Sequence, residues 1–78
     1  MAHVVLYSRP GCHLCDVARG TIAEVGRRDA FTFEEVSIEG DDALEYAYGI
    51  RIPVVLVDGA EAFEIEVDRD RLRALVRS

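Results

Sequence analysis

The sequence predicts an α/β domain spanning residues 1–78, in which helices cover both faces of a four-stranded sheet. Short apolar runs bounded by Pro, Gly or Asp alternate with stretches whose apolar residues recur at helical spacing. Half of the residues are apolar and 31% are charged, a composition that excludes a disordered or collagen-like chain. No linker or repeat divides the sequence, so we expect one small core.

The first strand is predicted at residues 4–7, an apolar run stopped by Pro10 and Gly11. A helix follows and is expected to end at Gly26. Its buried face is predicted from apolar residues at the 3.6-residue period, namely Leu14, Val17, Ala18, Ile22 and Val25. Gly20, inside this helix, is expected to allow close packing.

A second strand is predicted at residues 31–38, although its alternation changes phase at Glu34 and Glu35. The next helix is short, with Asp42 and Glu45 as a capping pair and Gly49 as its end. Its inward residues are predicted to be Leu44, Ala47 and Tyr48.

Residues 53–57 predict a third strand, and Asp58-Gly59 is the two-residue turn that favours a hairpin. The fourth strand is expected to continue at period two through Phe63, Ile65 and Val67. Asp68 is expected to cap a last helix. The first strand–helix–strand unit should be parallel and right-handed, but periodicity does not give the direction of the third strand.

Charge and hydropathy exclude two classes of partner. Fifteen acidic against nine basic residues give a net charge of −6, which argues against binding to nucleic acid. The longest apolar run, residues 52–57, is far shorter than the ~20 residues of a membrane helix. Because no export signal is visible, we expect a cytoplasmic monomer.

Cys12 and Cys15 lie where the first strand leads into the first helix, and in a reducing compartment such a pair is catalytic or metal-binding. A helix N-terminus stabilises a thiolate by up to ~2 kcal/mol, so we expect the pKa of the Cys12 thiol to lie below its usual ~8.5, without assigning it a value. Arg9 and His13 are cations that would stabilise the thiolate. The carboxylate of Asp16 would destabilise the thiolate unless Arg19 or His13 forms an ion pair with it.

This geometry predicts that Cys12 attacks a disulfide and that Cys15 then displaces the substrate from Cys12. The reaction needs no metal and no organic cofactor. Three alternatives stay open: two buried small hydrophobic residues, a zinc site that also uses His3 and His13, and an iron–sulfur cluster shared between two chains.

Residues 7–15 read Tyr-Ser-Arg-Pro-Gly-Cys-His-Leu-Cys and resemble the active-site segment of glutaredoxins and their small glutaredoxin-like relatives. The order of elements resembles the thioredoxin fold, which implies sheet order 2-1-3-4 and a third strand antiparallel to the first. Arg-Ile-Pro-Val at residues 51–54 resembles the family's second signature. That resemblance implies a cis peptide bond before Pro53, facing the cysteines, and a free Ile52 backbone that pairs with an extended substrate.

The resemblance implies a dithiol–disulfide oxidoreductase acting on a disulfide-containing protein or a low-molecular-weight thiol, with a reductase or a thiol as electron donor. Arg9, His13, Ile52 and Pro53 are then the substrate-side residues. The alternative is a non-enzymatic module of the same fold that binds an iron–sulfur cluster or acts as a regulatory thiol switch.

The sequence departs from glutaredoxins in two places. His13-Leu14 replaces the common Pro-Tyr between the cysteines, and the Gly-Gly pair after the fourth strand is absent. Residues 64–68 instead carry three carboxylates where the anionic tripeptide glutathione would dock, which is a repulsive feature. The likeness is therefore greatest to the glutaredoxin-like group that has Cys-x-x-Cys without a glutathione signature.

Overall fold

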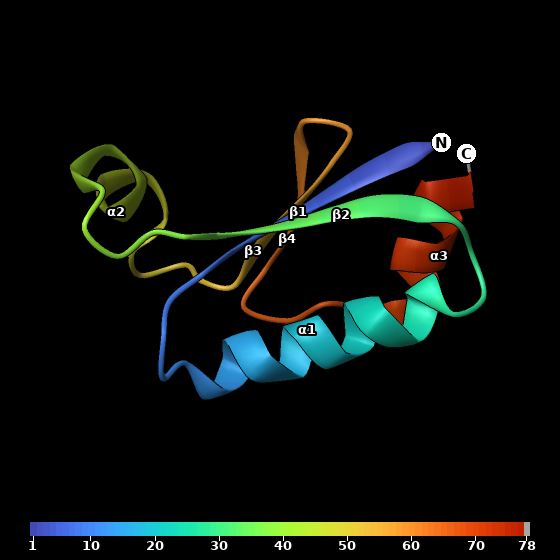
Figure 1. Cartoon of the computed structure of the whole chain (residues 1–78), viewed down its shortest axis with the longest axis horizontal. Helices are drawn as coiled ribbons and strands as arrows, with labels where there is room; N and C mark the ends of the chain where they lie inside the picture. Colours follow the sequence, from blue (N-terminus) through green and yellow to red (C-terminus); the bar gives the residue numbers. More distant parts are fainter. Residues whose placement is uncertain (78) are drawn as a thin grey trace.

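The computed structural model describes residues 1–77, in which three helices flank a four-stranded mixed sheet (Figure 1). The strands are β1 Ala2–Ser8, β2 Phe31–Ser37, β3 Val54–Val57 and β4 Ala60–Glu64. The helices are α1 His13–Gly26, α2 Asp42–Tyr48 and α3 Arg69–Arg77. No helix in this part of the chain is long and apolar enough to cross a membrane.

The sheet has the order β2-β1-β3-β4, with β1 parallel to β2 and antiparallel to β3. This arrangement confirms the order and the strand directions that the resemblance implied. The β1–α1–β2 unit has the parallel strands predicted for the first half of the chain.

The main core lies between the sheet and the two helices α1 and α3, which lie together below the sheet in Figure 1. Alternate residues of β1 enter this core, whereas Tyr7 points to the opposite face of the sheet. There Tyr7 stacks on Tyr48 of α2, with ring centroids 4.5 Å apart. Helices therefore lie on both faces, as predicted, but α2 covers only one end of the second face.

The buried face of α1 differs from the prediction. Leu14 and Val17 are 44% and 53% exposed, and the buried row consists of Cys15, Ala18, Ile22 and Val25. Leu14 lies one position, or about 100° of helix rotation, before the first member of that row, so it projects beyond the edge of the core. The predicted buried face did not include Cys15, because the prediction treats this cysteine as a reactive thiol and not as an apolar residue.

The short helix α2 begins one residue earlier than predicted. Asp41, and not Asp42, is its N-cap, because the Asp41 carboxylate accepts the Leu44 N–H at 3.1 Å. Ala47 was expected to face inward but is exposed, and only Leu44 and Tyr48 are half-buried.

The β3–β4 hairpin turns at Asp58 and Gly59, whose φ angles are 52° and 84°, and this confirms the predicted two-residue turn. The fourth strand was predicted too far along the chain: β4 ends at Glu64, so Ile65 and Val67 lie outside it. The pairing ends at Glu64 because its partner Val54 is the first residue of β3 and follows Pro53, which has no N–H to donate. Within β4, Val55 pairs with Phe63 while Leu56 pairs with Glu61, so a bulge leaves one extra residue and shifts the alternation.

The last helix is capped as predicted. The Asp68 carboxylate accepts the Arg71 N–H at 3.1 Å, and the Asp68 carbonyl accepts the Leu72 N–H at 2.9 Å. Leu72 and Val76 bury the inner face of α3 against the main core.

Gly20 is exposed on α1, and a methyl group added there would contact nothing within 4 Å, so the expected close packing is absent. We therefore predict that Gly20→Ala raises the free energy of unfolding by about 1 kcal/mol, because alanine loses less backbone entropy in a helix. Urea denaturation followed by circular dichroism measures this change.

Gly59→Ala is the matched control, since Gly59 also has open space around it but adopts the left-handed φ of 84°. This variant is expected to lose stability. A gain for Gly59→Ala, or a loss for Gly20→Ala, would contradict the assignment of the two backbone conformations.

Candidate active site

The cysteine pair is positioned by the tight turn between β1 and α1. Gly11 has φ of 76°, a left-handed conformation that favours glycine, and it directs the chain into the helix. Cys12 is the N-cap: its backbone is extended, its sulfur accepts the Cys15 N–H at 3.2 Å, and its carbonyl accepts the Asp16 N–H at 3.1 Å. The sulfur thus occupies the place that a Ser, Thr or Asp oxygen usually takes at a helix start.

Cys12 and Cys15 form a disulfide, with their Cα atoms 5.2 Å apart. Cys15 is fully buried, whereas Cys12 is only partly buried. Cys12 is therefore the sulfur that an external molecule reaches first, and Cys15 lies behind it, one turn into α1, as the sequence predicted.

Pro53 lies at the same end of the sheet as the cysteine turn. The register pairs Val54 at the start of β3 with Tyr7 near the end of β1. The Ile52–Pro53 peptide bond is cis, in agreement with the resemblance; Pro53 is buried and Ile52 half-buried. The Pro53 carbonyl accepts the Ile65 N–H at 2.8 Å, so the residue after β4 is joined to this site as well.

The two predicted cations lie on different sides of the turn. The Arg9 guanidinium lies 3.1 Å from the Glu45 carboxylate of α2. His13 is the exposed first residue of α1, and its side chain has no hydrogen bond or ion pair within residues 1–77. The roles of Arg9 and His13 toward a substrate stay predictions.

His3, the ligand considered for a zinc site, lies at the far end of β1. Its backbone pairs with Asp58 after β3, and its ring lies 2.6 Å from the Thr32 hydroxyl. Among the described residues, no group of three or more His, Cys, Asp or Glu side chains is placed to hold a metal ion.

A polar network behind the cysteine turn links α1 to β1 and β2. Arg19 lies 2.7 Å from the Asp16 carboxylate and donates two hydrogen bonds to Glu35, which also accepts the Ser8 hydroxyl at 2.6 Å. Asp16 is thus held by Arg19, one of the two partners the sequence offered. Glu35 and the buried Ser8 were missed as members of the site; the phase change at Glu34-Glu35 was the signal that could have found Glu35.

The network fixes the charges of its members. Hydrogen bonds from Arg19, and to a lesser extent from Ser8, hold the pKa of Glu35 below its usual range against the opposing effect of burial. Hydrogen bonds to Glu35 and then Asp16 raise the pKa of Arg19. The guanidinium therefore remains charged and offsets the carboxylates of Asp16 and Glu35.

The chain is similar to known proteins over nearly all of its length. The family described as a glutaredoxin-like domain (DUF836) matches residues 3–77. The Mycobacterium tuberculosis protein Rv0508, itself uncharacterized, is 36% identical over 76 residues, which cover 91% of this chain and 78% of the relative.

Solved structures agree with this result. The protein XcR50 of X. campestris is 46% identical with a TM-score of 0.74 over 91% of each chain. Protein Ne2328 of Nitrosomonas europaea is 27% identical with a TM-score of 0.83, covering 96% of this chain and 91% of that one. A thioredoxin of Halobacterium salinarum, 20% identical with a TM-score of 0.70 over 97% of this chain and 72% of its own, shows the shared thioredoxin fold alone.

We predict that Arg19→Met raises the pKa of the Cys12 thiol by about 0.5, because Asp16 then faces the first turn of α1 without its cation. Asp16→Asn combined with Arg19→Met should reverse the part of this change that comes from Asp16, while Glu35 stays without its cation. The rate of Cys12 alkylation as a function of pH, in a Cys15→Ser background, measures both. An unchanged profile for Arg19→Met would show that the charge of Asp16 does not reach Cys12.

The ion pair of Glu35 predicts how the free energy of unfolding depends on pH. Its pKa is lower in the folded chain than in the unfolded one, so its stabilising effect is full above the unfolded value of ~4.3 and is lost as the pH falls through the folded value. Glu35→Gln should therefore lower the free energy of unfolding at pH 7 by about 1 kcal/mol, since the carboxylate is partly exposed. Below about pH 4 the difference should shrink.

Urea denaturation at pH 7 and pH 3.5 tests this expectation. The control is Glu39→Gln, because Glu39 lies in an exposed turn and its carboxylate forms no ion pair within residues 1–77. A Glu35→Gln effect that is the same at both pH values would exclude the charge of Glu35 as its cause.

Proposed function

The chain belongs to the glutaredoxin-like family, and from this premise we propose that it is a dithiol–disulfide oxidoreductase. One observation carries the proposal: a disulfide between a partly exposed N-cap Cys12 and a fully buried Cys15 at the start of α1. Cys12 precedes the first residue of α1 and Cys15 lies within its first turn. A disulfide between these two positions can be opened and closed without rearranging the core.

The first step begins with the reduced pair. The Cys12 thiolate attacks one sulfur of a substrate disulfide, the substrate S–S bond breaks, and one substrate thiolate leaves and takes up a proton. The Cys15 N–H and the N-terminal end of α1 stabilise the negative charge on Cys12 before the attack. This stabilisation is the physical reason for assigning the attack to Cys12.

The second step regenerates a free substrate. Cys15 loses its proton and attacks the Cys12 sulfur of the mixed disulfide, which releases the second substrate thiol and closes the Cys12–Cys15 bond. Two electrons have then passed to the substrate. A reductase or a thiol must return them to the protein, a requirement that a reducing compartment such as the cytoplasm meets.

The substrate is expected to lie along the turn that precedes β3. Ile52 offers its backbone there, and Pro53 forms the wall beside the cysteines. His13 is free to contact a substrate, whereas Arg9 would first have to leave Glu45. One copy of the chain contains every group that the two steps use.

We predict that Cys12→Ser abolishes the reduction of a model disulfide, whereas reduced Cys15→Ser still attacks it and accumulates the mixed disulfide. Mass spectrometry of the intact protein after mixing with bis(2-hydroxyethyl) disulfide identifies the adduct on Cys12. An adduct that forms on Cys15 in the Cys12→Ser protein, and none in Cys15→Ser, would reverse the order of attack. Absorbance above ~400 nm after anaerobic purification would instead favour the cluster-binding alternative.

A further inference from the structure

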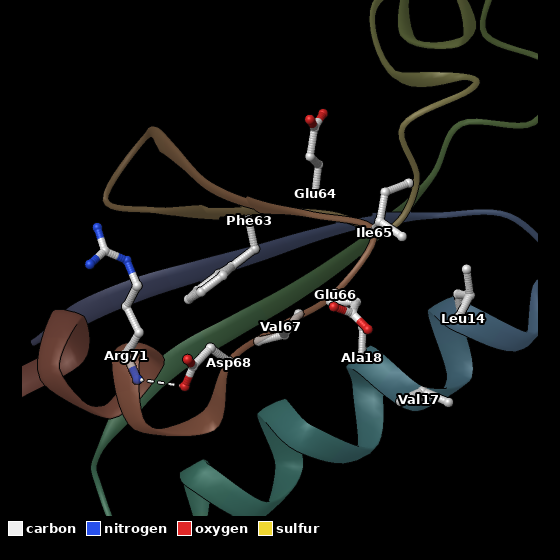
Figure 2. Close-up of a pocket in the computed structure, with 10 residues that line it drawn as sticks. All are labelled: Leu14, Val17, Ala18, Phe63, Glu64, Ile65, Glu66, Val67, Asp68 and Arg71. Atoms are coloured by element: carbon white, nitrogen blue, oxygen red, sulfur yellow. Dashed lines mark hydrogen bonds between the residues drawn. The ribbon is translucent and has the colours of Figure 1, made fainter.

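A groove of about 620 Å³ lies along α1 from Leu14 onward, between this helix and the segment that joins β4 to α3 (Figure 2). Leu14, between the two cysteines, lines one end together with Ile65, whose N–H donates to the Pro53 carbonyl. Arg71 of α3 lies at the other end, as Figure 2 shows. The groove therefore begins beside Leu14, the neighbour of Cys15 in the chain, and leads away from the cysteine turn.

The floor and rim at the thiol end are apolar and exposed. Leu14 and Val17 of α1 lie outside the core, and Ile65 is 39% exposed. Ile65 also has φ of 70°, a left-handed conformation that is strongly unfavourable for a β-branched residue. Strain of this kind persists where the surrounding structure imposes it, and it is concentrated at functional sites.

The groove carries one unpaired carboxylate at the end near Leu14, whereas the Arg71 guanidinium at the other end also forms no ion pair or side-chain hydrogen bond within residues 1–77. Glu64 is directed away from α1 in Figure 2 and lies 3.2 Å from Arg51. Asp68 is occupied by its cap hydrogen bond to the Arg71 N–H. Glu66, exposed in the lining, has no side-chain hydrogen bond or ion pair within residues 1–77, so its carboxylate is available to a ligand.

We propose that this groove binds the polypeptide segment next to the disulfide of a protein substrate, and that the segment is cationic, with Lys or Arg paired to Glu66 and apolar side chains on Leu14, Val17 and Ile65. The inference rests on the proposed function and adds the substrate class. Complementary charge favours such a segment, whereas an anionic tripeptide such as glutathione would place its carboxylates against Glu66.

The test compares two synthetic peptides that each hold one internal disulfide and differ only in three residues flanking the cysteines, all Lys in one and all Glu in the other. Pre-reduced protein is mixed with each peptide in a single turnover, and the ratio of the two second-order rate constants is compared between variants. Intrinsic differences between the peptides cancel in this comparison. Bis(2-hydroxyethyl) disulfide and glutathione disulfide serve as neutral and anionic small substrates.

The unaltered chain is expected to prefer the Lys peptide, and Glu66→Lys should lower the Lys-to-Glu ratio about two- to fivefold, less at high salt. Glu39→Lys is the matched control. It changes the net charge by the same amount, but Glu39 follows β2, which lies at the opposite edge of the sheet from β4. Ile65→Gly should slow the Lys peptide about threefold, through lost apolar contact, without lowering the stability of the fold. The rate with the neutral disulfide should stay unchanged in Glu66→Lys and Glu39→Lys.

Equal ratios in Glu66→Lys and Glu39→Lys, or faster reduction of glutathione disulfide than of the Lys peptide, would overturn the inference while leaving the oxidoreductase in place. If no disulfide is reduced, the proposed function fails. The groove is then tested by titrating the Lys peptide into isotope-labelled protein, where shifts confined to Leu14, Ile65 and Glu66 amides support binding and their absence refutes it.

Discussion

The site depends on one geometric constraint: the chain must pass from the end of β1 into α1 within the four residues 9–12. A left-handed Gly11 makes the turn, and the next residue has to adopt extended backbone and offer an acceptor to the helix N–H groups. Cys12 meets both conditions with its sulfur. The sulfur that we propose as the nucleophile is therefore also the helix cap, and its partner Cys15 is placed one turn deeper by the period of the helix.

This placement matters because the chain as a whole is acidic, and acidic surroundings oppose a thiolate. Within residues 1–77, the arginines nearest to the cysteine turn in sequence are already paired, Arg9 with Glu45 and Arg19 with Glu35 and Asp16. Their charges are largely balanced locally. In the proposed reaction, the Cys15 N–H and the dipole of α1 would then stabilise a negative sulfur on Cys12, and neither depends on a flexible side chain.

The sequence predicted the order of elements, the hairpin turn, the α3 cap and the cysteine pair because each depends on residues close together along the chain. Its errors arose where distant contacts decide. The exposure of Leu14 depends on where the sheet ends, the phase of β4 depends on a bulge against β3, and the role of Glu35 depends on the parallel pairing of β1 with β2. Pro53 was placed beside the cysteines only through the resemblance, since the direction of β3 is not encoded in its periodicity.

The two edges of the sheet contribute different features to the site. Toward β2, Ser8, Glu35 and Arg19 form a closed polar network that holds the first turns of α1 in place. Toward β4, the groove is open, apolar and carries the unpaired Glu66. Because order β2-β1-β3-β4 puts these regions at opposite edges, the proposed thiol reactivity and the proposed substrate preference rest on different residues. Under these proposals, a substitution in the groove changes the preference for substrate charge and leaves the cysteine turn intact.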